Sequence, residues 1–357
     1  MHPNKILVAM SGGVDSAVTA LLLKEQGYDC LGATMKLNPP AATLGQATKS
    51  CCNPEEIVHA KQIAALLGIP HSVFDLSEAF CRHVVDYFVE TYLQGGTPNP
   101  CVACNRSMKF GELMKKATDY GCAKMATGHY VHVQKDPGGR WLLRCAKDLS
   151  KDQTYVLWSL TQEQLSRTVF PLGDLTKAEV REIAAANGFS NAQKKDSQDI
   201  CFVPDGDYAA FIERYTQKNF PQGEFVDLEG RVLGTHHGVI RYTIGQRKGL
   251  GIAFGAPTYV VDKNAEQNRV VLGSNEDLFR RELTAHSINL IATDRISSPI
   301  RVLAKVRYRA TAAWATAEQT DDDCLRLVFD EPQRAISTGQ SVVLYDGDTV
   351  IGGGIID

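Results

Sequence analysis

The sequence has no long apolar run and no excess of charge of one sign. Among its 357 residues, no apolar stretch approaches the roughly 18 residues of a membrane-spanning helix, and no cationic leader precedes an apolar segment at its start. Lysine and arginine number 38 against 41 acidic residues, which gives a net charge of −3. We therefore expect a cytoplasmic protein with no membrane partner, in which nucleic-acid binding depends on local basic patches.

The ten cysteines come without the features of a disulfide scaffold or a structural zinc site. A chain with no secretory leader is not expected to be held together by disulfides. A second C-x-x-C and a linked pair of histidines are both missing, which argues against closed zinc coordination. Five cysteines are expected to be ordinary core residues, namely Cys30, Cys81, Cys122, Cys145 and Cys324.

The pattern of the first 205 residues predicts an α/β fold. Apolar runs at 6–10, 30–37, 71–76 and 124–133 read as strands, and the segments between them read as amphipathic helices that stop at glycine. This alternation predicts a doubly wound parallel sheet with its ligand at the carboxyl ends of the strands. In the loop at 38–53, the role of the adjacent Cys51 and Cys52 stays open.

From residue 206 onward the sequence pattern changes, and short β-like segments bounded by glycine follow one another. At 357 residues the chain is long for a single core, so two or three domains are expected. We predict a catalytic domain over 1–205 and two small β-rich, barrel-like domains over 206–275 and 276–357. A charged linker is expected at 274–283, and GVIRYTIG at 238–245 reads as a strand.

An apolar strand runs directly into SGGVDS at 11–16 and then into a helix. Adjacent glycines let the backbone approach an anion, and the new helix offers N–H groups and its positive end. Neither the Walker loop, with its lysine, nor the G-x-G-x-x-G fingerprint is present. Two hydroxyls and Asp15, which could sit beside a divalent cation, suit a bound pyrophosphate. The residues match SGG-x-DS of the PP-loop ATP pyrophosphatases, which cleave ATP between its α- and β-phosphates and transfer AMP to an oxygen.

Three cysteines stand in settings that favour chemistry. Cys101 and Cys104 form C-x-x-C after Pro98 and Pro100, close to the start of a helix, where the dipole stabilises a thiolate. Cys201 follows two lysines at 194–195 that would act in the same way. The C-x-x-C by itself fits a redox pair, half a zinc site or part of an iron–sulfur site.

Taken in order, the motifs resemble the bacterial tRNA-specific 2-thiouridylase family. The matching segments are AMSGGVDS at 9–16, TMKL at 34–37, TPNPCVACN at 97–105, ATGHY at 126–130, SKDQTY at 150–155, DSQDICF at 196–202, YTIGQRKGLG at 242–251 and KVRYR at 305–309. Members use ATP and Mg²⁺ to replace the C2 oxygen of the wobble uridine with sulfur in tRNAs for Lys, Glu and Gln. The sulfur comes from a cysteine desulfurase or a relay protein.

The resemblance implies particular site residues. The ATP site would comprise Ala9, Met10, Ser11, Gly12, Gly13, Val14, Asp15, Ser16, Met35 and Gly128. The nucleophile would be Cys104 and the persulfide carrier Cys201. The target base and the tRNA would be met by Asn99, Pro100, Cys101, Lys151, Asp152, Gln153, Tyr308 and Arg309. His129 is expected to be structural.

One position departs from the family, since many members carry Asp where Cys101 stands. That carboxylate has been assigned acid/base help, so either the Cys101 thiol takes over the proton transfer or the role lies elsewhere. The same substitution completes a set of Cys101, Cys104 and Cys201 that could hold a [4Fe–4S] cluster with one open iron. Two routes for sulfur therefore stay open, a persulfide and a cluster. A rival function is that of another PP-loop synthetase that needs no cysteine.

The segments 241–248 (RYTIGQRK) and 305–309 interleave tyrosine with cations. Single-stranded anticodon loops are recognised by stacking and local positive charge, and such segments suit that task.

Overall fold

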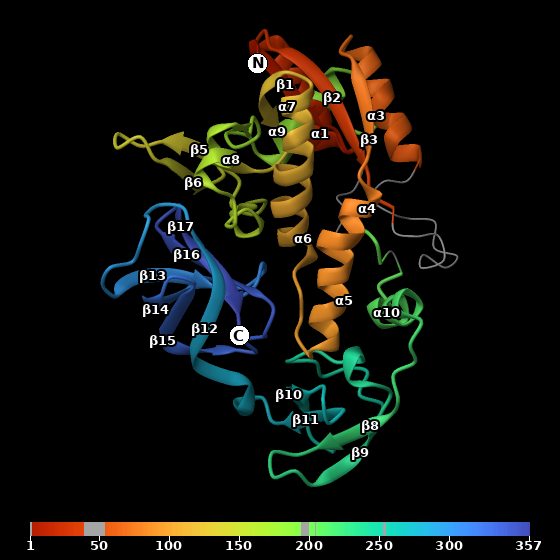
Figure 1. Cartoon of the computed structure of the whole chain (residues 1–357), viewed down its shortest axis with the longest axis vertical. Coiled ribbons are helices and arrows are strands. Elements are labelled where there is room, and N and C mark those ends of the chain that lie inside the picture. The colour runs from red at the N-terminus through yellow and green to blue at the C-terminus, as the bar shows by residue number, and fades with distance from the viewer. Residues whose placement is uncertain (1, 39–53, 194–199, 204, 253–254) are drawn as a thin grey trace.

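The first domain is built on a five-stranded parallel sheet. The computed structural model describes residues 2–38, 54–193, 200–203, 205–252 and 255–357. The strands follow the order β3-β2-β1-β4-β7, shown at the top of Figure 1. They are β1 (His2–Ala9), β2 (Asp29–Lys36), β3 (His71–Asp75), β4 (Cys122–Ala126) and β7 (Thr168–Val169). Every neighbouring pair is parallel, which confirms the predicted α/β fold.

Helices cover both faces of this sheet because the second half of its central strand, residues 6–9, is apolar. Ile6 and Val8 enter one core cluster and Leu7 enters the other, and all three are fully buried, as expected for a strand covered on both faces. One layer contains α1 (Val14–Glu25), α3 (Pro54–Leu66) and α9 (Lys177–Ala186). The other contains two continuous helices, each with a π-helical middle. The first consists of α4 (Ser77–Phe80), η1 (Cys81–Val85) and α5 (Asp86–Leu93). The second consists of α6 (Pro100–Ala103), η2 (Cys104–Leu113) and α7 (Met114–Asp119).

The predicted strand over 124–133 is in fact two strands in two different sheets. The ATGHY turn ends β4, and the chain continues as β5 (Val131–Lys135), which pairs with β6 (Trp141–Cys145) as an antiparallel hairpin. This hairpin joins the C-terminal sheet where Thr349 pairs with Arg144. The domain is completed by η3 (Thr154–Val156) and α8 (Gln162–Ser166).

The middle of the chain forms a small four-stranded sheet after helix α10 (Tyr208–Thr216). Its order is β10-β11-β8-β9, with β8 (Gly223–Val226), β9 (Val232–His236), β10 (Tyr259–Asn264) and β11 (Arg269–Gly273). The segment 238–245 is not the expected strand. It forms the short 3₁₀ helix η4 (Val239–Arg241) and turns, because Gly238 and Gly245 both take positive φ values, 103° and 87°.

The C-terminal part is a closed six-stranded barrel. Its strands are β12 (Phe279–Leu290), β13 (Ile300–Lys305), β14 (Ala313–Asp321), β15 (Cys324–Arg334), β16 (Ser341–Asp346) and β17 (Thr349–Ile356). Pairing between β12 and β17 closes the ring, which leaves no open edge among the six strands. The expected linker at 274–283 holds η5 (Glu276–Leu278) and the start of β12 instead.

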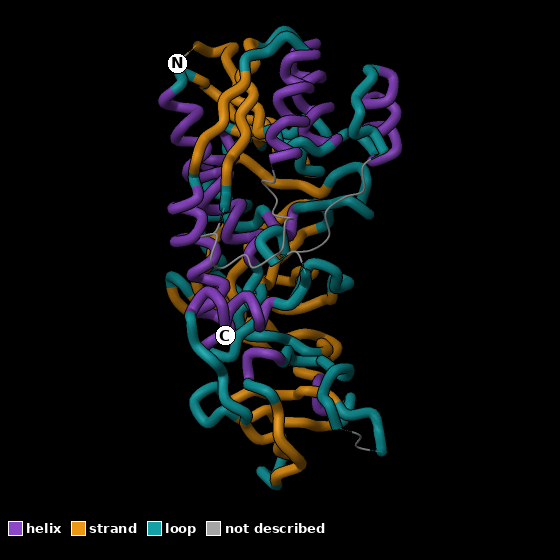
Figure 2. The backbone as a smooth tube through the Cα atoms, turned by 90° about the vertical axis from the view of Figure 1, so that its right-hand side faces the viewer, coloured by secondary structure: helices purple, strands orange, loops and turns teal. Residues whose placement is uncertain are grey.

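In the side view of Figure 2 the molecule is elongated, with the parallel sheet at one end and the four-stranded sheet at the other. None of the helices in the described part of the chain is both long and apolar enough to span a bilayer.

Candidate active site

The SGGVDS turn lies between the end of β1 and the start of α1, as predicted. Gly12 has a φ of 77° and no room for a side chain, since a Cβ there would lie 2.5 Å from the Glu56 carbonyl oxygen. The Ser16 hydroxyl donates to the Gly13 carbonyl (3.0 Å) and accepts from the Ser11 N–H (3.2 Å). The turn is therefore shaped before any ligand binds, with Ser11 exposed at its surface.

A second turn, ATGHY, lies directly beside the first. β1 and β4 are neighbours in the sheet, and the chain order reverses between them, which makes this the switch point where ligands bind in such folds. A Cβ on Gly128 would lie 2.9 Å from the Asp15 carbonyl carbon and 3.0 Å from the Ser16 nitrogen. The two predicted ATP-binding motifs thus meet at the N-terminus of α1.

Two residues that the sequence did not single out engage Asp15. The Lys177 ammonium lies 2.8 Å from both carboxylate oxygens, and the Tyr130 hydroxyl donates to one of them at 2.7 Å. Lys177 is only 8% exposed, whereas the Asp15 side chain is half-buried, so only the ammonium is largely shielded from water. In the structure the Asp15 carboxylate is paired with Lys177, and its position beside a divalent cation stays a prediction.

The sequence around Lys177 nevertheless contains a pattern that predicts the start of a helix at this residue. Thr176 and Glu179 form a capping box in which each side chain bonds the other residue's backbone N–H, and T-x-x-E predicts such a helix start. Lys177 is then the first helical residue, where a cation opposes the helix dipole. A lysine placed against the dipole indicates a specific anionic partner, here Asp15.

Met35 lies near the carboxyl end of β2, half-buried against the core. Its neighbour Thr34 donates to the Met10 carbonyl at 2.7 Å, which ties β2 to the start of the glycine turn. This places Met35 on the same sheet edge as the turn, and its contact with adenine stays a prediction.

The C-x-x-C begins the long α6–η2–α7 helix, which runs past the sheet in Figure 1. Asn99 is the N-cap, with its side chain accepting from the Val102 N–H at 3.3 Å, and Pro100 occupies the first turn. Cys101 is exposed and Cys104 is half-buried. Both thiols therefore lie in the first two turns, near the positive end of the helix dipole.

Phe202, the residue after Cys201, packs against the helical layer that also contains the helix of Cys104. The Phe202 ring packs edge-on against Phe80 at 5.6 Å and Phe88 at 5.1 Å, residues of α4 and α5. The helix that carries Cys104 also packs against α4 and η1. Lys194 and Lys195, expected to act on Cys201, lie outside the described residues, as do Cys51 and Cys52.

Among the described residues every cysteine is a thiol. Desolvation raises the pKa of the five cysteines expected to be structural, to about 11 for Cys30 and Cys145, and also for Cys81, Cys122 and Cys324. These five are poor nucleophiles at neutral pH. No cluster of three or more His, Cys, Asp or Glu side chains in the described part of the chain is placed to hold a metal, so Cys101, Cys104 and Cys201 do not form a ready cluster site.

Some of the predicted tRNA-contacting residues meet where the first domain contacts the barrel. The Tyr308 hydroxyl donates to the Asp152 carbonyl at 3.2 Å. Burial raises the pKa of Tyr308, and nearby Asp152 and Cys101 add to the rise. Tyr308 and Arg309 are exposed, as RNA contacts must be. Gln153 instead braces the ATGHY turn, accepting from the Tyr130 N–H at 3.0 Å.

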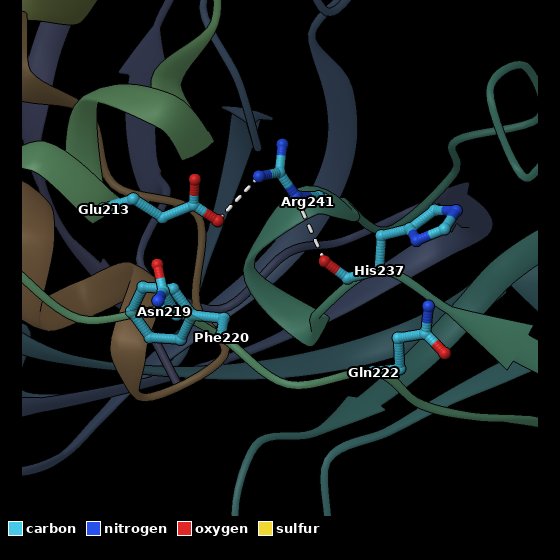
Figure 3. Close-up of a pocket in the computed structure, with 6 residues that line it drawn as sticks. All are labelled: Glu213, Asn219, Phe220, Gln222, His237 and Arg241. Carbon is cyan, nitrogen blue, oxygen red and sulfur yellow. Dashed lines mark hydrogen bonds and ion pairs between the residues drawn. The ribbon is translucent and has the colours of Figure 1, made fainter.

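The segment 241–248 does not present the expected row of tyrosine and cations. Arg241 pairs with Glu213 at 2.6 Å and donates to the His237 carbonyl at 3.1 Å, the two contacts drawn in Figure 3. Tyr242 is buried, with 3% exposure. Of the charged residues in the segment 241–248, only Arg247 and Lys248 are exposed. Arg241 belongs to an open depression of about 460 Å³, far along the chain from the glycine turn.

A glycine turn after β1, a second glycine turn after β4 and a helix N-terminus between them define a PP-loop nucleotide-binding protein. Three family models match the chain in succession, described as "tRNA methyl transferase HUP domain" over 4–205, "tRNA methyl transferase PRC-barrel domain" over 209–274 and "Aminomethyltransferase beta-barrel domain" over 280–356.

Full-length relatives are more specific. A protein of Clostridioides difficile named tRNA-specific 2-thiouridylase MnmA is 50% identical over 354 residues, covering 99% of this chain and 98% of that protein. The protein of the same name from Acetivibrio thermocellus is 48% identical and covers 100% of both chains. The chain belongs to the tRNA-specific 2-thiouridylase MnmA family, as its motifs indicated.

Solved structures resemble the chain more distantly. A 4-thiouridine synthetase in complex with RNA and ATP is 18% identical, with a TM-score of 0.38 over 60% of this chain and 50% of that one. An NMN synthetase from Francisella tularensis is 15% identical, with a TM-score of 0.36 over 61% of this chain and 79% of the other.

Proposed function

We propose that this chain replaces the C2 oxygen of the wobble uridine of tRNA with sulfur, using ATP to activate the oxygen and a cysteine persulfide to supply the sulfur. It is a tRNA sulfurtransferase by family, and the formation of 2-thiouridine in tRNA is the activity that its relatives' name describes. The observation that carries the proposal is that, within the PP-loop domain, the helix of Cys104 and the Phe202 ring next to Cys201 pack against the same helix, α4.

The first half of the reaction takes place at the glycine turns. The uridine, flipped out of the anticodon stack, places its O2 against the α-phosphate of ATP. A bond forms between O2 and phosphorus, the bond to the β-phosphate oxygen breaks, and pyrophosphate leaves onto the N–H groups at the start of α1. Mg²⁺ would enter with the ATP phosphates, since no described residues form a separate metal site.

The second half takes place at the cysteines. A sulfur donor loads Cys201 as a persulfide, Cys–S–SH. The Cys104 thiolate attacks the inner sulfur, forming a Cys104–Cys201 disulfide and releasing the outer sulfur as hydrosulfide, which takes the electron pair of the broken S–S bond. Hydrosulfide adds to C2, AMP leaves with the original oxygen, and an external dithiol reduces the disulfide.

The partners follow from this chemistry. The substrate would be tRNA for Lys, Glu and Gln, bound through Lys151, Tyr308 and Arg309 at the barrel junction. A cysteine desulfurase or a relay protein would load Cys201. We infer that the reaction takes place in the cytoplasm, where both tRNA and ATP are found.

Two alternatives give different outcomes. A [4Fe–4S] cluster on Cys101, Cys104 and Cys201 would deliver sulfide without a persulfide, but these residues are not gathered as ligands. Iron and acid-labile sulfide in anaerobically purified protein, together with loss of activity on iron removal, would favour it. A PP-loop synthetase that transfers no sulfur would need neither Cys104 nor Cys201.

The test is reconstitution with unmodified tRNA, ATP, a desulfurase and a dithiol. We expect Cys104→Ser and Cys201→Ser to lose at least about 100-fold in 2-thiouridine formation while pyrophosphate release persists, because only the sulfur half is removed. Cys145→Ser is the matched control, since that thiol is half-buried against Thr154 and has no role in the scheme. Full thiolation by either of the first two variants would refute the persulfide route.

A further inference from the structure

Lys109 is a half-buried cation without an anionic partner. Its ammonium lies 3.3 Å from Nε2 of His129, and among the described residues no carboxylate forms an ion pair with it. Burial lowers the pKa of His129 well below its usual range, and nearby Lys109 adds to the fall, so the imidazole is neutral. A neutral acceptor does not offset the charge of a partly desolvated ammonium. The arrangement suits an anion that arrives with a ligand.

His129 holds Lys109 in a fixed place. The ring is 6% exposed, and its other nitrogen, Nδ1, lies 2.7 Å from the Thr127 hydroxyl. With Nε2 accepting from Lys109, Nδ1 carries the proton and donates to that hydroxyl. The preceding residue, Gly128, touches the backbone of Asp15 and Ser16. Lys109 is thus attached to the turn that packs on the start of α1.

Lys109 and Cys104 also belong to the same π-helical element. In an α-helix, residues five apart lie on different sides, whereas the wider π-turn brings residue i+5 almost over residue i. Lys109 is five residues after Cys104, and both belong to η2 (Cys104–Leu113). Lys109 is therefore carried by the same helical element as the predicted nucleophile, while its ammonium contacts the ATGHY turn.

We propose that Lys109 binds the α-phosphate of ATP and stays on it in the adenylated uridine, supplying the cation that SGGVDS lacks. The other candidate, Lys177, is already neutralised by Asp15. The inference rests on the proposed function, because it assigns a residue to the adenylation step. A charge aimed at a developing negative charge lowers the barrier more than it tightens ground-state binding.

The experiment measures pyrophosphate release with tRNA and ATP for Lys109→Gln and Lys109→Arg. Glutamine keeps a hydrogen-bond donor toward His129 but removes the charge, and arginine keeps the charge. We expect Lys109→Gln to lower kcat by about 100-fold or more with less than a threefold change in KM for ATP, and Lys109→Arg to recover at least tenfold of that loss. Lys115→Met on the same helix is the control, since Lys115 is an exposed partner of Glu112.

The outcomes are distinguishable. Wild-type protein that releases no pyrophosphate would contradict the proposed function itself. Wild-type release together with an unchanged Lys109→Gln variant would overturn only the assignment of Lys109. A variant that releases pyrophosphate normally but does not thiolate would move Lys109 to the sulfur step. Equal losses in the glutamine and arginine variants, with a lowered Tm in both, would reduce Lys109 to a structural role.

Discussion

Gly128 illustrates how a single residue without a side chain joins two motifs that are more than a hundred positions apart. It lies where the backbone of the second turn reaches the backbone of Asp15 and Ser16. At such a contact the neighbours are main-chain atoms, which cannot rotate away as a side chain can. The residue type is therefore dictated by the close approach of two turns.

Gly128→Ala should displace one turn from the other. The added Cβ would fall 2.9 to 3.0 Å from backbone atoms of Asp15 and Ser16, so we expect KM for ATP to rise at least about tenfold and stability to fall by about 1–3 kcal/mol. Gly138→Ala is the control, because the Cβ there meets only the Asp136 side chain, at 3.3 Å. Equal ATP affinity in both variants, measured by calorimetry, would show that the contact is unimportant.

Among the elements, helix α9 contributes both to the core and to the glycine turn. It packs against α1 in the core and carries Lys177 to Asp15. Its capping box fixes where the first turn begins, and thus where the Lys177 side chain starts. α8 has an equivalent capping box of Thr161 and Gln164 but no contact with the glycine turn, so the two helices form a natural pair for comparison.

Thr176→Ala and Thr161→Ala should each lower the free energy of unfolding by about 1 kcal/mol, the usual cost of losing an N-cap. Only Thr176→Ala should also weaken ATP binding, because it loosens the turn that positions Lys177. Chemical denaturation checks the first expectation and titration with ATP the second. If both variants bind ATP like the wild type, the start of α9 has no part in shaping the nucleotide site.

At the scale of the whole molecule, the barrel holds the segment that leads into the reactive helix. The Thr97 N–H donates to the Thr338 carbonyl at 2.8 Å. The Gln340 amide donates to the carbonyls of Thr97 and Pro98 at 2.9 and 3.2 Å. The barrel and the segment that leads to Cys101 are thereby linked through a few hydrogen bonds.

Gln340→Ala should loosen this link. We expect a fall of about tenfold in kcat for thiolation and a loss of about 1 kcal/mol in stability, since two carbonyls lose their donor. Gln333→Ala is the control, because that amide bonds only Glu331 of its own strand. Unchanged kcat in Gln340→Ala, measured at saturating tRNA, would mean that the reactive segment holds its shape without the barrel.

Patterns of neighbouring residues were sufficient to predict those features that depend only on neighbouring residues. The apolar run before SGGVDS, the prolines Pro98 and Pro100 before a helix and the alternation in 1–205 predicted the parallel sheet, the turn between strand and helix and the helix that carries the C-x-x-C. Two strand predictions were wrong for one reason. In both 124–133 and 238–245, glycines redirect an apolar run that alternation alone assigns to a strand.

What the sequence determined by itself is therefore the fold class and the family, since SGGVDS and the other motifs are made of adjacent residues. Only the tertiary structure decided which charges meet. Lys177 and Asp15 are 162 positions apart, as Lys109 and His129 are 20 apart, and no local pattern encodes such pairs. They are set by the tertiary fold, because the order of the strands and the packing of their helices bring side chains that are distant in the sequence into contact.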